Sequence, residues 1–368
     1  MVVCENHAKG IQSISSAVLG CRTSMRTNGS MRMSIPGRAA ILCGIGSWVP
    51  PDILTNDAIA GMFATSDEWI RRRTGIACRH VVSAGMATSE LAVEAGQRAL
   101  KAAGLDAVDA LILATTTPDH RCPATAPAVA TRLGLGTIPA FDIAAVCSGF
   151  IYALANGAGL IASGVADRVL IIGADAFTSI LDPDDRTTRA IFGDGAGAVV
   201  LRAGDAEEVG ALGPVTLGSD GRGADLITVR AGGSRLAWND AGCESDRYFT
   251  MAGQAVYRRA VQTMAESCTH VLELADWPVS AVDWLVCHQA NQRIIDGVAA
   301  RLGIPAERCL ANIDRVGNTG AASIPLALGY GAERGLLCEG DRVVLTAFGG
   351  GLTWGSIVLS WPEIRCVD

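Results

Sequence analysis

The sequence predicts an α/β protein built from two similar halves, each a sheet of buried, mainly parallel strands with helices on both faces. Three observations support this fold class. The chain has 368 residues, more than one ordinary hydrophobic core accommodates. It has 49% hydrophobic residues and 43 glycines but only 5% aromatic residues, which is typical of closely packed α/β layers. Finally, similar phrases recur in the same order in both parts of the chain.

The first 38 residues differ from the rest of the chain. They carry five basic residues against the single acidic Glu5, together with several serines. Such a segment is typical of an organellar transit peptide, although it lacks the apolar stretch of a secretory signal. We favour the simpler interpretation, in which residues 1–38 are a leader or a disordered extension and Met31 or Met33 is the initiator.

Four pairs of phrases form the repeat, and in three of them both members read as buried strands. The pairs are VDALILATTT from Val108 with VDWLVCHQAN from Val282, CSGFIYALANGAGLIASG from Cys147 with NTGAASIPLALGYGAERG from Asn318, DRVLIIGADA from Asp167 with DRVVLTAFGGG from Asp341, and GAVVL from Gly197 with GSIVL from Gly355. The first pair (108 and 282) and the third (167 and 341) are both 174 residues apart. We therefore expect halves at 39–205 and 206–368, related by a pseudo-twofold axis.

Composition and spacing exclude several functional classes. A net charge of -7, from 30 basic and 37 acidic residues, provides no general field for nucleic acid, so we expect no such partner. No apolar run reaches the roughly 18 residues of a membrane span. The 12 cysteines show no CxxC spacing, and most lie in apolar runs. They read as free thiols of a cytoplasmic protein rather than as disulfides or metal ligands.

Cys147 differs from the other cysteines because it lies between a predicted strand, Phe141 to Val146, and a helix that begins at Ser148-Gly149. This is the strand-turn-helix arrangement of a nucleophile elbow. Unpaired amide hydrogens at a helix start stabilise a thiolate, so we expect a low thiol pKa. An inert core cysteine is the alternative for a lone Cys in an apolar run.

Asn318 occupies the helix start that is equivalent to Cys147 in the repeat, and His288 follows the equivalent of the strand that ends at Thr115. His288 follows the strand WLVC and so lies at a strand's carboxyl end, where ligands bind in open α/β sheets. Asn318 begins the second small-residue helix, where helix capping alone would explain it. The glycines of FGGGLTWG, from Phe348, expose backbone N–H groups of the kind an oxyanion hole needs, although a simple turn is the alternative.

At this point the chain resembles the β-ketoacyl-acyl-carrier-protein synthase III enzymes of the thiolase-like superfamily. The resemblance covers about Ile41 to Pro362 and rests on motifs in the family's order, which are TSDEWIRRRTGI, AAVCSGF, IFGDGAGAVVL, CHQAN, GNTGAASIP and FGGGLTWG. It implies a thiolase-like fold, a duplicated α-β-α-β-α arrangement of layers with pseudo-twofold related halves.

The resemblance also implies a reaction. Cys147 would accept an acyl group from acyl-coenzyme A as a thioester. His288 and Asn318 would donate hydrogen bonds to malonyl-acyl carrier protein and stabilise the enolate formed as carbon dioxide leaves. The carbanion would attack the Cys147 thioester, whose oxyanion the backbone N–H groups of Cys147 and Gly350 would hold. The resemblance implies no metal and no redox cofactor. Coenzyme A takes part as the thioester substrate.

Further positions are carried over for the binding of the two substrates. Thr65, Trp69, Arg73 and Arg186 resemble the coenzyme A site, where an indole and a guanidinium sandwich the adenine. Asn291 resembles a pantetheine contact. Arg293 resembles a contact for the acidic carrier protein, with Arg258 and Arg259 as weaker candidates.

Three positions depart from the family pattern, which are Val146 for Ala, Leu352 for Phe and Cys122 for Phe. In the family the Cys122 loop reaches into the acyl pocket of the dimer partner, so we expect a homodimer and acceptance of primers longer or more branched than acetyl. Whether the product is a fatty acid or a specialised metabolite stays open.

Other readings also stay open. A relative with the same triad could use an unusual starter or a different acceptor, or transfer the acyl group to an alcohol. A non-catalytic partner of a synthase complex would have a damaged triad, whereas this triad is intact. A redox or thiol-protease role lacks a resolving cysteine or an acidic partner at suitable spacing.

Overall fold

The computed structural model describes residues 38–364 of the chain. The predicted leader, apart from its last residue, therefore lies outside the described residues. Arg38 belongs with the folded protein, because its Nε donates to the carbonyl of Ile161 (3.0 Å) and its guanidinium forms an ion pair with Asp167. No helix in the described range is both long and apolar enough to cross a membrane.

The first sheet has five strands in the order β1-β7-β6-β4-β5. β4 runs parallel to both β5 and β6, while β7 runs antiparallel to β6 and to β1. Helices α3 and α4 cover one face and α5 packs on the other. The bounds are β1 (Ala39–Trp48), β4 (Ala110–Ala114), β5 (Ala140–Ile143), β6 (Arg168–Asp175), β7 (Gly195–Gly204), α3 (Thr88–Ala103), α4 (Ala126–Arg132) and α5 (Gly149–Ala162).

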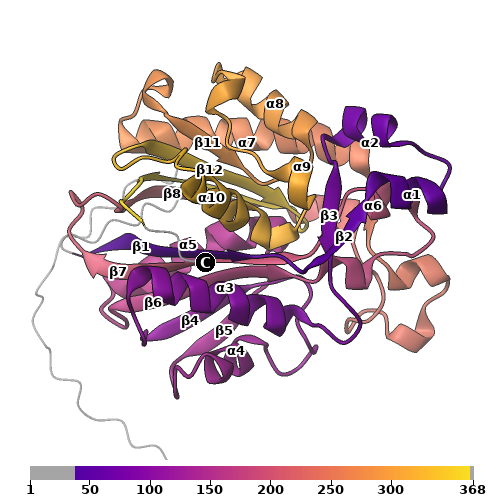
Figure 1. Cartoon of the computed structure of the whole chain (residues 1–368), viewed down its shortest axis with the longest axis horizontal. Coiled ribbons are helices and arrows are strands. Elements are labelled where there is room, and N and C mark those ends of the chain that lie inside the picture. The colour runs from indigo at the N-terminus through magenta and orange to yellow at the C-terminus, as the bar shows by residue number, and fades with distance from the viewer. Residues whose placement is uncertain (1–37, 365–368) are drawn as a thin grey trace, which may run out of the picture. The chain divides into compact units, whose positions relative to one another are not determined.

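The second sheet has four strands in the order β11-β12-β13-β8. β11 and β12 are parallel, and the other two pairings are antiparallel. Helices α7 and α8 lie outside this sheet, and α10 lies between the two sheets with α5 (Figure 1). The bounds are β8 (Leu212–Ser219), β11 (Trp284–Cys287), β12 (Arg342–Gly349), β13 (Thr353–Ser360), α7 (Gly253–Ala275), α8 (Gln292–Leu302) and α10 (Ser323–Glu333).

The predicted duplication is confirmed by the order and direction of the strands. β8, β13, β12 and β11 repeat the arrangement of β1, β7, β6 and β4. The counterpart of β5 is reduced to a single parallel bridge between Leu285 and Cys309. With α5 and α10 in the middle, the layers are α-β-α-β-α, as the resemblance implied (Figure 1).

The central core explains why α5 and α10 are rich in small residues. Side chains from both helices and both sheets, among them Ile151, Ile324 and Leu345, form one buried cluster. The helices approach the strands closely, because a Cβ at Gly173 would lie only 2.5 Å from the carbonyl oxygen of Ala321. A larger residue there would push the start of α10 away from β6.

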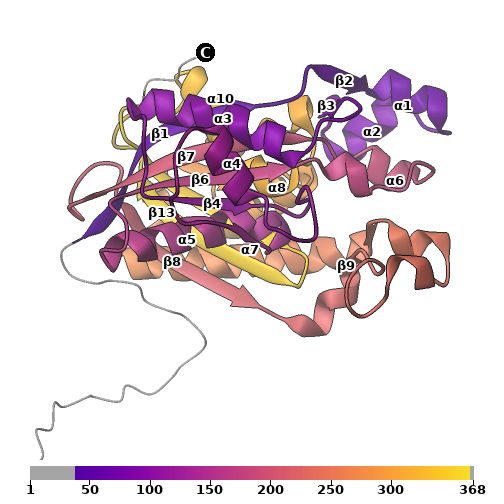
Figure 2. The ribbon, with the colours of Figure 1, turned by 90° about the horizontal axis from the view of Figure 1, so that it is seen from below.

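The remaining elements gather at one side of the layers, as Figures 1 and 2 both show for the labelled α1, α2, α6, β2 and β3. Helix α2 is capped by the Ser66 side chain, which accepts from the Trp69 N–H, and ends at Gly75 in the left-handed region (φ 81°). The bounds are β2 (Asp52–Thr55), α1 (Asn56–Met62), α2 (Asp67–Thr74), β3 (Cys78–Val81), α6 (Arg186–Arg189), β9 (Ile227–Thr228), β10 (Thr250–Met251) and α9 (Ile313–Val316).

Candidate active site

Cys147 lies in a tight turn between β5 and α5. The expectation that the strand runs to Val146 is wrong, because β5 ends at Ile143 and residues 146–148 form a short 3₁₀ turn. Val146 has a φ of 47°, in the left-handed region that a β-branched residue strongly disfavours. A conformation of this kind costs about 1–3 kcal/mol and survives only where the surrounding structure holds it.

One narrow cavity brings the three predicted reactive side chains together. Cys147, His288 and Asn318 all line this space, which has a volume of about 30 Å³. His288 comes directly after β11, and Asn318 comes two residues before the 3₁₀ turn that leads into α10. The rest of the wall is apolar and consists of Phe192, Ile227, Phe249, Met251, Val256, Ala260, Met264, Ala290, Ile294 and Phe348.

The expected low pKa of the Cys147 thiol is wrong for this structure. The residue is only 8% exposed, and this burial is the main cause that raises its pKa above the ordinary value. The carboxylate of Asp175 raises the pKa further, and the residue's own backbone N–H lowers it only in part. The resting side chain is therefore a neutral thiol.

His288 is buried and uncharged. Desolvation lowers its pKa to about 3, so the imidazole is neutral at physiological pH. Its backbone N–H donates to the carbonyl of Thr346 (2.8 Å), which fixes the loop after β11 to β12. Its Nδ1 lies 2.6 Å from the Oγ of Ser323.

Asn318 is held by both its backbone and its side chain. Its N–H donates to Ile191 (2.9 Å), and its carbonyl accepts from Gly193 (3.0 Å). Its Oδ1 accepts from the N–H of Gly320 (3.1 Å), which caps the turn before α10. Because the amide oxygen is used in this way, Nδ2 is the atom that remains to donate to a ligand.

Asp175, at the end of β6, is a buried carboxylate that sequence reasoning did not single out. One oxygen accepts from the N–H of Thr116 (2.6 Å) and the other from the N–H of Ala321 (2.7 Å). Burial raises its pKa to about 6, although these hydrogen bonds oppose the shift. It therefore joins the loop after β4 to the start of α10, beside Asn318.

The glycine turn between β12 and β13 packs against the nucleophile turn. A Cβ at Gly349 would lie 2.9 Å from the backbone nitrogen of Cys147, so no side chain fits there. The sequence pointed to Gly350, which is the next residue and packs against Ile227. Thr353 Oγ1 donates to the carbonyl of Ala145 (3.1 Å) and so anchors β13 to the same turn.

Trp69, Arg73 and Arg186 form a cluster at the side of the layers. The guanidinium carbons of Arg73 and Arg186 lie 5.7 Å and 5.1 Å from the centre of the Trp69 ring, within the range of a cation-π contact. A base inserted between ring and guanidinium needs roughly 7 Å, two van der Waals contacts. The 5.1 Å between the Trp69 ring and the Arg186 guanidinium is therefore too short for a flat ring to fit between them in this structure.

The other predicted binding residues lie around this cluster and the start of α8. The Oγ1 of Thr65 is buried without a hydrogen-bond partner among the described residues. Asn291 caps α8 by accepting from the N–H of Arg293 (2.9 Å), and its Nδ2 donates to the carbonyl of Arg73 (3.2 Å). Arg293 is exposed and lies over the Tyr257 ring.

Cys122 is exposed on its loop and does not line the cavity of its own chain. The nine cysteines within the described range are all free. No group of three or more His, Cys, Asp or Glu side chains in residues 38–364 is arranged to hold a metal ion.

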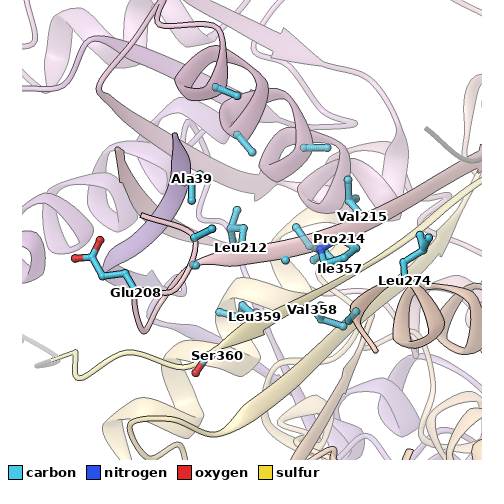
Figure 3. A pocket seen from close by; sticks show the side chains of 18 of the residues that line it. Ala39, Glu208, Leu212, Pro214, Val215, Leu274, Ile357, Val358, Leu359 and Ser360 are labelled. Carbon is cyan, nitrogen blue, oxygen red and sulfur yellow. The ribbon is translucent and has the colours of Figure 1, made fainter. Parts of the chain in front are cut away.

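A larger cavity of about 680 Å³ lies between α5, β8 and β13 and is shown in Figure 3. None of the candidate residues lines it.

Comparison with known proteins gives consistent matches. Residues 141–221 match the family 3-oxoacyl-[acyl-carrier-protein (ACP)] synthase III, and residues 272–361 match its C-terminal part. The chain is 60% identical to beta-ketoacyl-[acyl-carrier-protein] synthase III 3 of Streptomyces coelicolor, over 89% of this chain and 98% of that protein.

Solved structures agree with these matches. The crystal structure of 3-oxoacyl-(acyl carrier protein) synthase III from Pseudomonas aeruginosa PAO1 is similar with a TM-score of 0.84 and 50% identity, covering 89% of this chain and 99% of that one. The priming beta-ketosynthase of the R1128 polyketide biosynthetic pathway is similar with a TM-score of 0.83 and 31% identity, covering 90% of this chain and 99% of that one.

Proposed function

The chain belongs to the 3-oxoacyl-[acyl-carrier-protein] synthase III family, and on that premise we propose how its own residues carry out the reaction. It is a condensing enzyme of the acyltransferase type, a ketosynthase that initiates fatty acid chains. The observation that carries the assignment of roles is the convergence of Cys147, His288 and Asn318 on one cavity.

In the first half-reaction, the Sγ of Cys147 attacks the thioester carbonyl of acyl-coenzyme A. A carbon-sulfur bond forms to Cys147, the bond to the coenzyme A sulfur breaks, and the proton of the Cys147 thiol leaves with coenzyme A. The backbone N–H groups of Cys147 and Gly350 hold the oxyanion. The close packing of Gly349 on the Cys147 nitrogen supports this, because it brings the two turns together.

In the second half-reaction, His288 Nε2 and Asn318 Nδ2 donate to the thioester carbonyl of malonyl-acyl carrier protein. The bond to the carboxylate breaks, carbon dioxide leaves, and the electron pair becomes an enolate that attacks the Cys147 thioester. The bond between the acyl carbon and the Cys147 sulfur breaks, a 3-oxoacyl-carrier protein forms, and the released Cys147 thiolate takes up a proton from water to restore the resting thiol. The neutral state of His288 supports a donor role rather than a charged one. The electron pair comes from decarboxylation, so we propose that no cofactor takes part.

Coenzyme A binds at the cluster of Trp69, Arg73 and Arg186. The buried, unpartnered hydroxyl of Thr65 supports this proposal, as do the two guanidinium groups that suit phosphate oxygens. Asn291 contacts the pantetheine arm, and Arg293 contacts the carrier protein. The exposure of Arg293 is consistent with a surface role.

The functional unit is a homodimer in which the Cys122 loop of each chain completes the acyl pocket of its partner. The exposed position of Cys122, away from its own chain's cavity, supports this arrangement.

We place the enzyme in the cytoplasm, on the evidence of its free cysteines. Priming of a polyketide is the second candidate function, supported by the similarity to the R1128 priming ketosynthase and by the small side chain at Cys122.

Replacing the nucleophile tests the assignment. In Cys147→Ala, acyl transfer from acyl-coenzyme A is lost, while decarboxylation of malonyl-acyl carrier protein stays measurable because His288 and Asn318 remain. The measurements are the mass added to the protein and the release of carbon dioxide. Cys268→Ala, which removes a buried thiol outside the cavity, should retain both activities. Loss of both half-reactions in a folded Cys147→Ala protein would contradict the division of roles.

A further inference from the structure

We propose that Ser323 fixes the imidazole of His288 in the tautomer that carries its proton on Nε2, and is therefore a positioning residue for the decarboxylation step. This inference rests on the proposed donor role of His288. It concerns a residue that the sequence motifs did not single out, at the first position of α10.

The geometry around the Ser323 hydroxyl assigns the direction of each hydrogen bond. Its Oγ lies 2.6 Å from His288 Nδ1 and 3.3 Å from the backbone nitrogen of Gln289. A backbone N–H only donates, so the Ser323 oxygen accepts from Gln289. Its second lone pair could accept from an Nδ1–H, so the direction of the bond to Nδ1 depends on where the hydroxyl hydrogen can go, and among the described residues Nδ1 is the acceptor within its reach. In a neutral imidazole an accepting Nδ1 leaves the proton on Nε2.

The opposite tautomer is disfavoured by burial. Both Ser323 and His288 are almost completely removed from solvent. A proton on Nδ1 would turn the Ser323 hydroxyl hydrogen away, and the described part of the chain offers it no other acceptor. Leaving a buried hydroxyl unpaired is costly enough to favour the Nε2–H form by about tenfold or more.

The tautomer decides what His288 does in the cavity. With its proton on Nε2, His288 acts as a donor beside Asn318 Nδ2 and stabilises a developing enolate oxygen. With its proton on Nδ1, it would present a lone pair to that oxygen and repel it. Acyl transfer to Cys147, as proposed above, uses no group of His288. Loss of Ser323 should therefore slow decarboxylation and leave acyl transfer without a comparable loss.

The experiment compares tautomer and half-reactions in the same proteins. Histidine labelled with ¹⁵N reports which imidazole nitrogen of His288 carries the proton, in the unaltered enzyme and in Ser323→Ala and Ser323→Cys. Decarboxylation of malonyl-acyl carrier protein and acylation of Cys147 are measured separately. Ser267→Ala is the matched control, because Ser267 is buried and bonds to Thr216 (2.8 Å) and Ser356 (2.8 Å) rather than to His288.

The unaltered enzyme should show protonated Nε2. In Ser323→Ala we expect a mixture of tautomers and decarboxylation about tenfold to a hundredfold slower, with acylation unchanged, because the hydroxyl that holds the bias is gone. Ser323→Cys, with a weaker donor of similar size, should fall between, and Ser267→Ala should match the unaltered enzyme.

Protonated Nδ1 in the unaltered enzyme overturns the proposal even if no Ser323 variant folds. Full decarboxylation in folded Ser323→Ala, or an equal loss of both half-reactions, also overturns it. The His288→Ala variant distinguishes a failure of the proposed role of His288 from a failure of the positioning role of Ser323. If His288→Ala decarboxylates normally, the proposed role of His288 fails. If it does not while Ser323→Ala does, only the positioning role fails.

Discussion

The pKa of the Cys147 thiol is set by a balance between burial and the groups that face its sulfur. Burial and the Asp175 carboxylate both favour the neutral thiol over the thiolate. The amide groups at the start of α5 act in the opposite direction, and they gain importance as negative charge develops in the transition state. In the proposed reaction, the turn would therefore favour negative charge in the transition state more than on the resting thiol.

A raised thiol pKa predicts a specific pH dependence for alkylation. The rate of iodoacetamide modification at Cys147 should rise about tenfold per pH unit between pH 7 and pH 9, because the thiolate fraction rises in that proportion below the pKa. Peptide mass spectrometry measures the rate at this residue. A rate that is already constant at pH 7 would show a low pKa and contradict the electrostatics described above.

The side chains that meet in the cavity could be predicted from sequence, and the groups that hold them could not. Cys147, His288 and Asn318 each follow a strand or precede a helix in a repeated phrase, so local pattern marks them. Ser323 and Asp175 act through contacts with residues far away in the chain, such as His288 and Ala321. No local pattern reports such a contact.

At the scale of elements, Arg79 on β3 connects the segments that carry Trp69 and Arg186, the cluster proposed to bind coenzyme A. The side chain is fully buried. Its Nη1 donates to Asn56 Oδ1 (2.8 Å) and its Nη2 to the carbonyl of Ala190 (2.7 Å), the residue directly after α6. Asn56 in turn donates to Asp67 in the first turn of α2 (2.8 Å). Arg79 thereby fixes the helix of Trp69 relative to the helix of Arg186.

Replacing Arg79 should weaken the use of coenzyme A thioesters selectively. In Arg79→Met we expect kcat/KM for acyl-coenzyme A to fall about tenfold, because the contacts that align the two helices are charge-assisted hydrogen bonds. Acyl-pantetheine, which lacks the adenine, should be used as before. Steady-state kinetics with the two thioesters measures the difference.

Ile112→Val is the control for general loss of stability. It removes one buried methylene from β4, away from the cluster, and should change neither thioester's kcat/KM. Equal loss with acyl-coenzyme A and acyl-pantetheine in Arg79→Met would show that Arg79 does not act through the adenine site.

The end of β5 shows that the local sequence pattern does not predict where this strand stops. The apolar run before Cys147 reads as strand up to Val146, yet β5 stops at Ile143. The packing of Gly349 against the Cys147 nitrogen and the bonds of Thr353 hold Val146 in its left-handed conformation. The turn is therefore shaped by β12 and β13, which lie about 200 residues further along the chain.

At the scale of the whole molecule, the repeat predicted the architecture because both copies keep the same order of strands and helices. The difference between copies was not predictable. The phrase of β5 has no strand counterpart, and only the bridge at Cys309 takes its place. We propose that the halves meet in the segment between β7 and β8, close to residue 205.

The Cys122 loop gives a prediction about primer choice in the proposed homodimer. The enzyme should accept C4 to C8 or branched acyl-coenzyme A, and Cys122→Phe should reduce turnover of these primers about tenfold relative to acetyl-coenzyme A by filling the partner's pocket. Competition between primers, read by product mass, measures the ratio.

Cys243→Phe, at another exposed cysteine, is the matched control for Cys122→Phe and should leave primer choice unchanged. A strong preference of the unaltered enzyme for acetyl-coenzyme A, or an unchanged ratio in Cys122→Phe, would contradict a role of this position in the pocket.

Within residues 38–364, the second sheet has no full strand at the place equivalent to β5, and this limits how many chains could pair through that edge. β5 is an edge strand paired only with β4, and its Phe141 is 36% exposed. When an edge strand pairs with the same edge strand of a second copy, its free backbone N–H and C=O groups are occupied and cannot pair with a third chain. Because the other half offers only a bridge at the equivalent place, a homodimer of the proposed kind that paired through β5 would stop at two chains and would not propagate into a fibre.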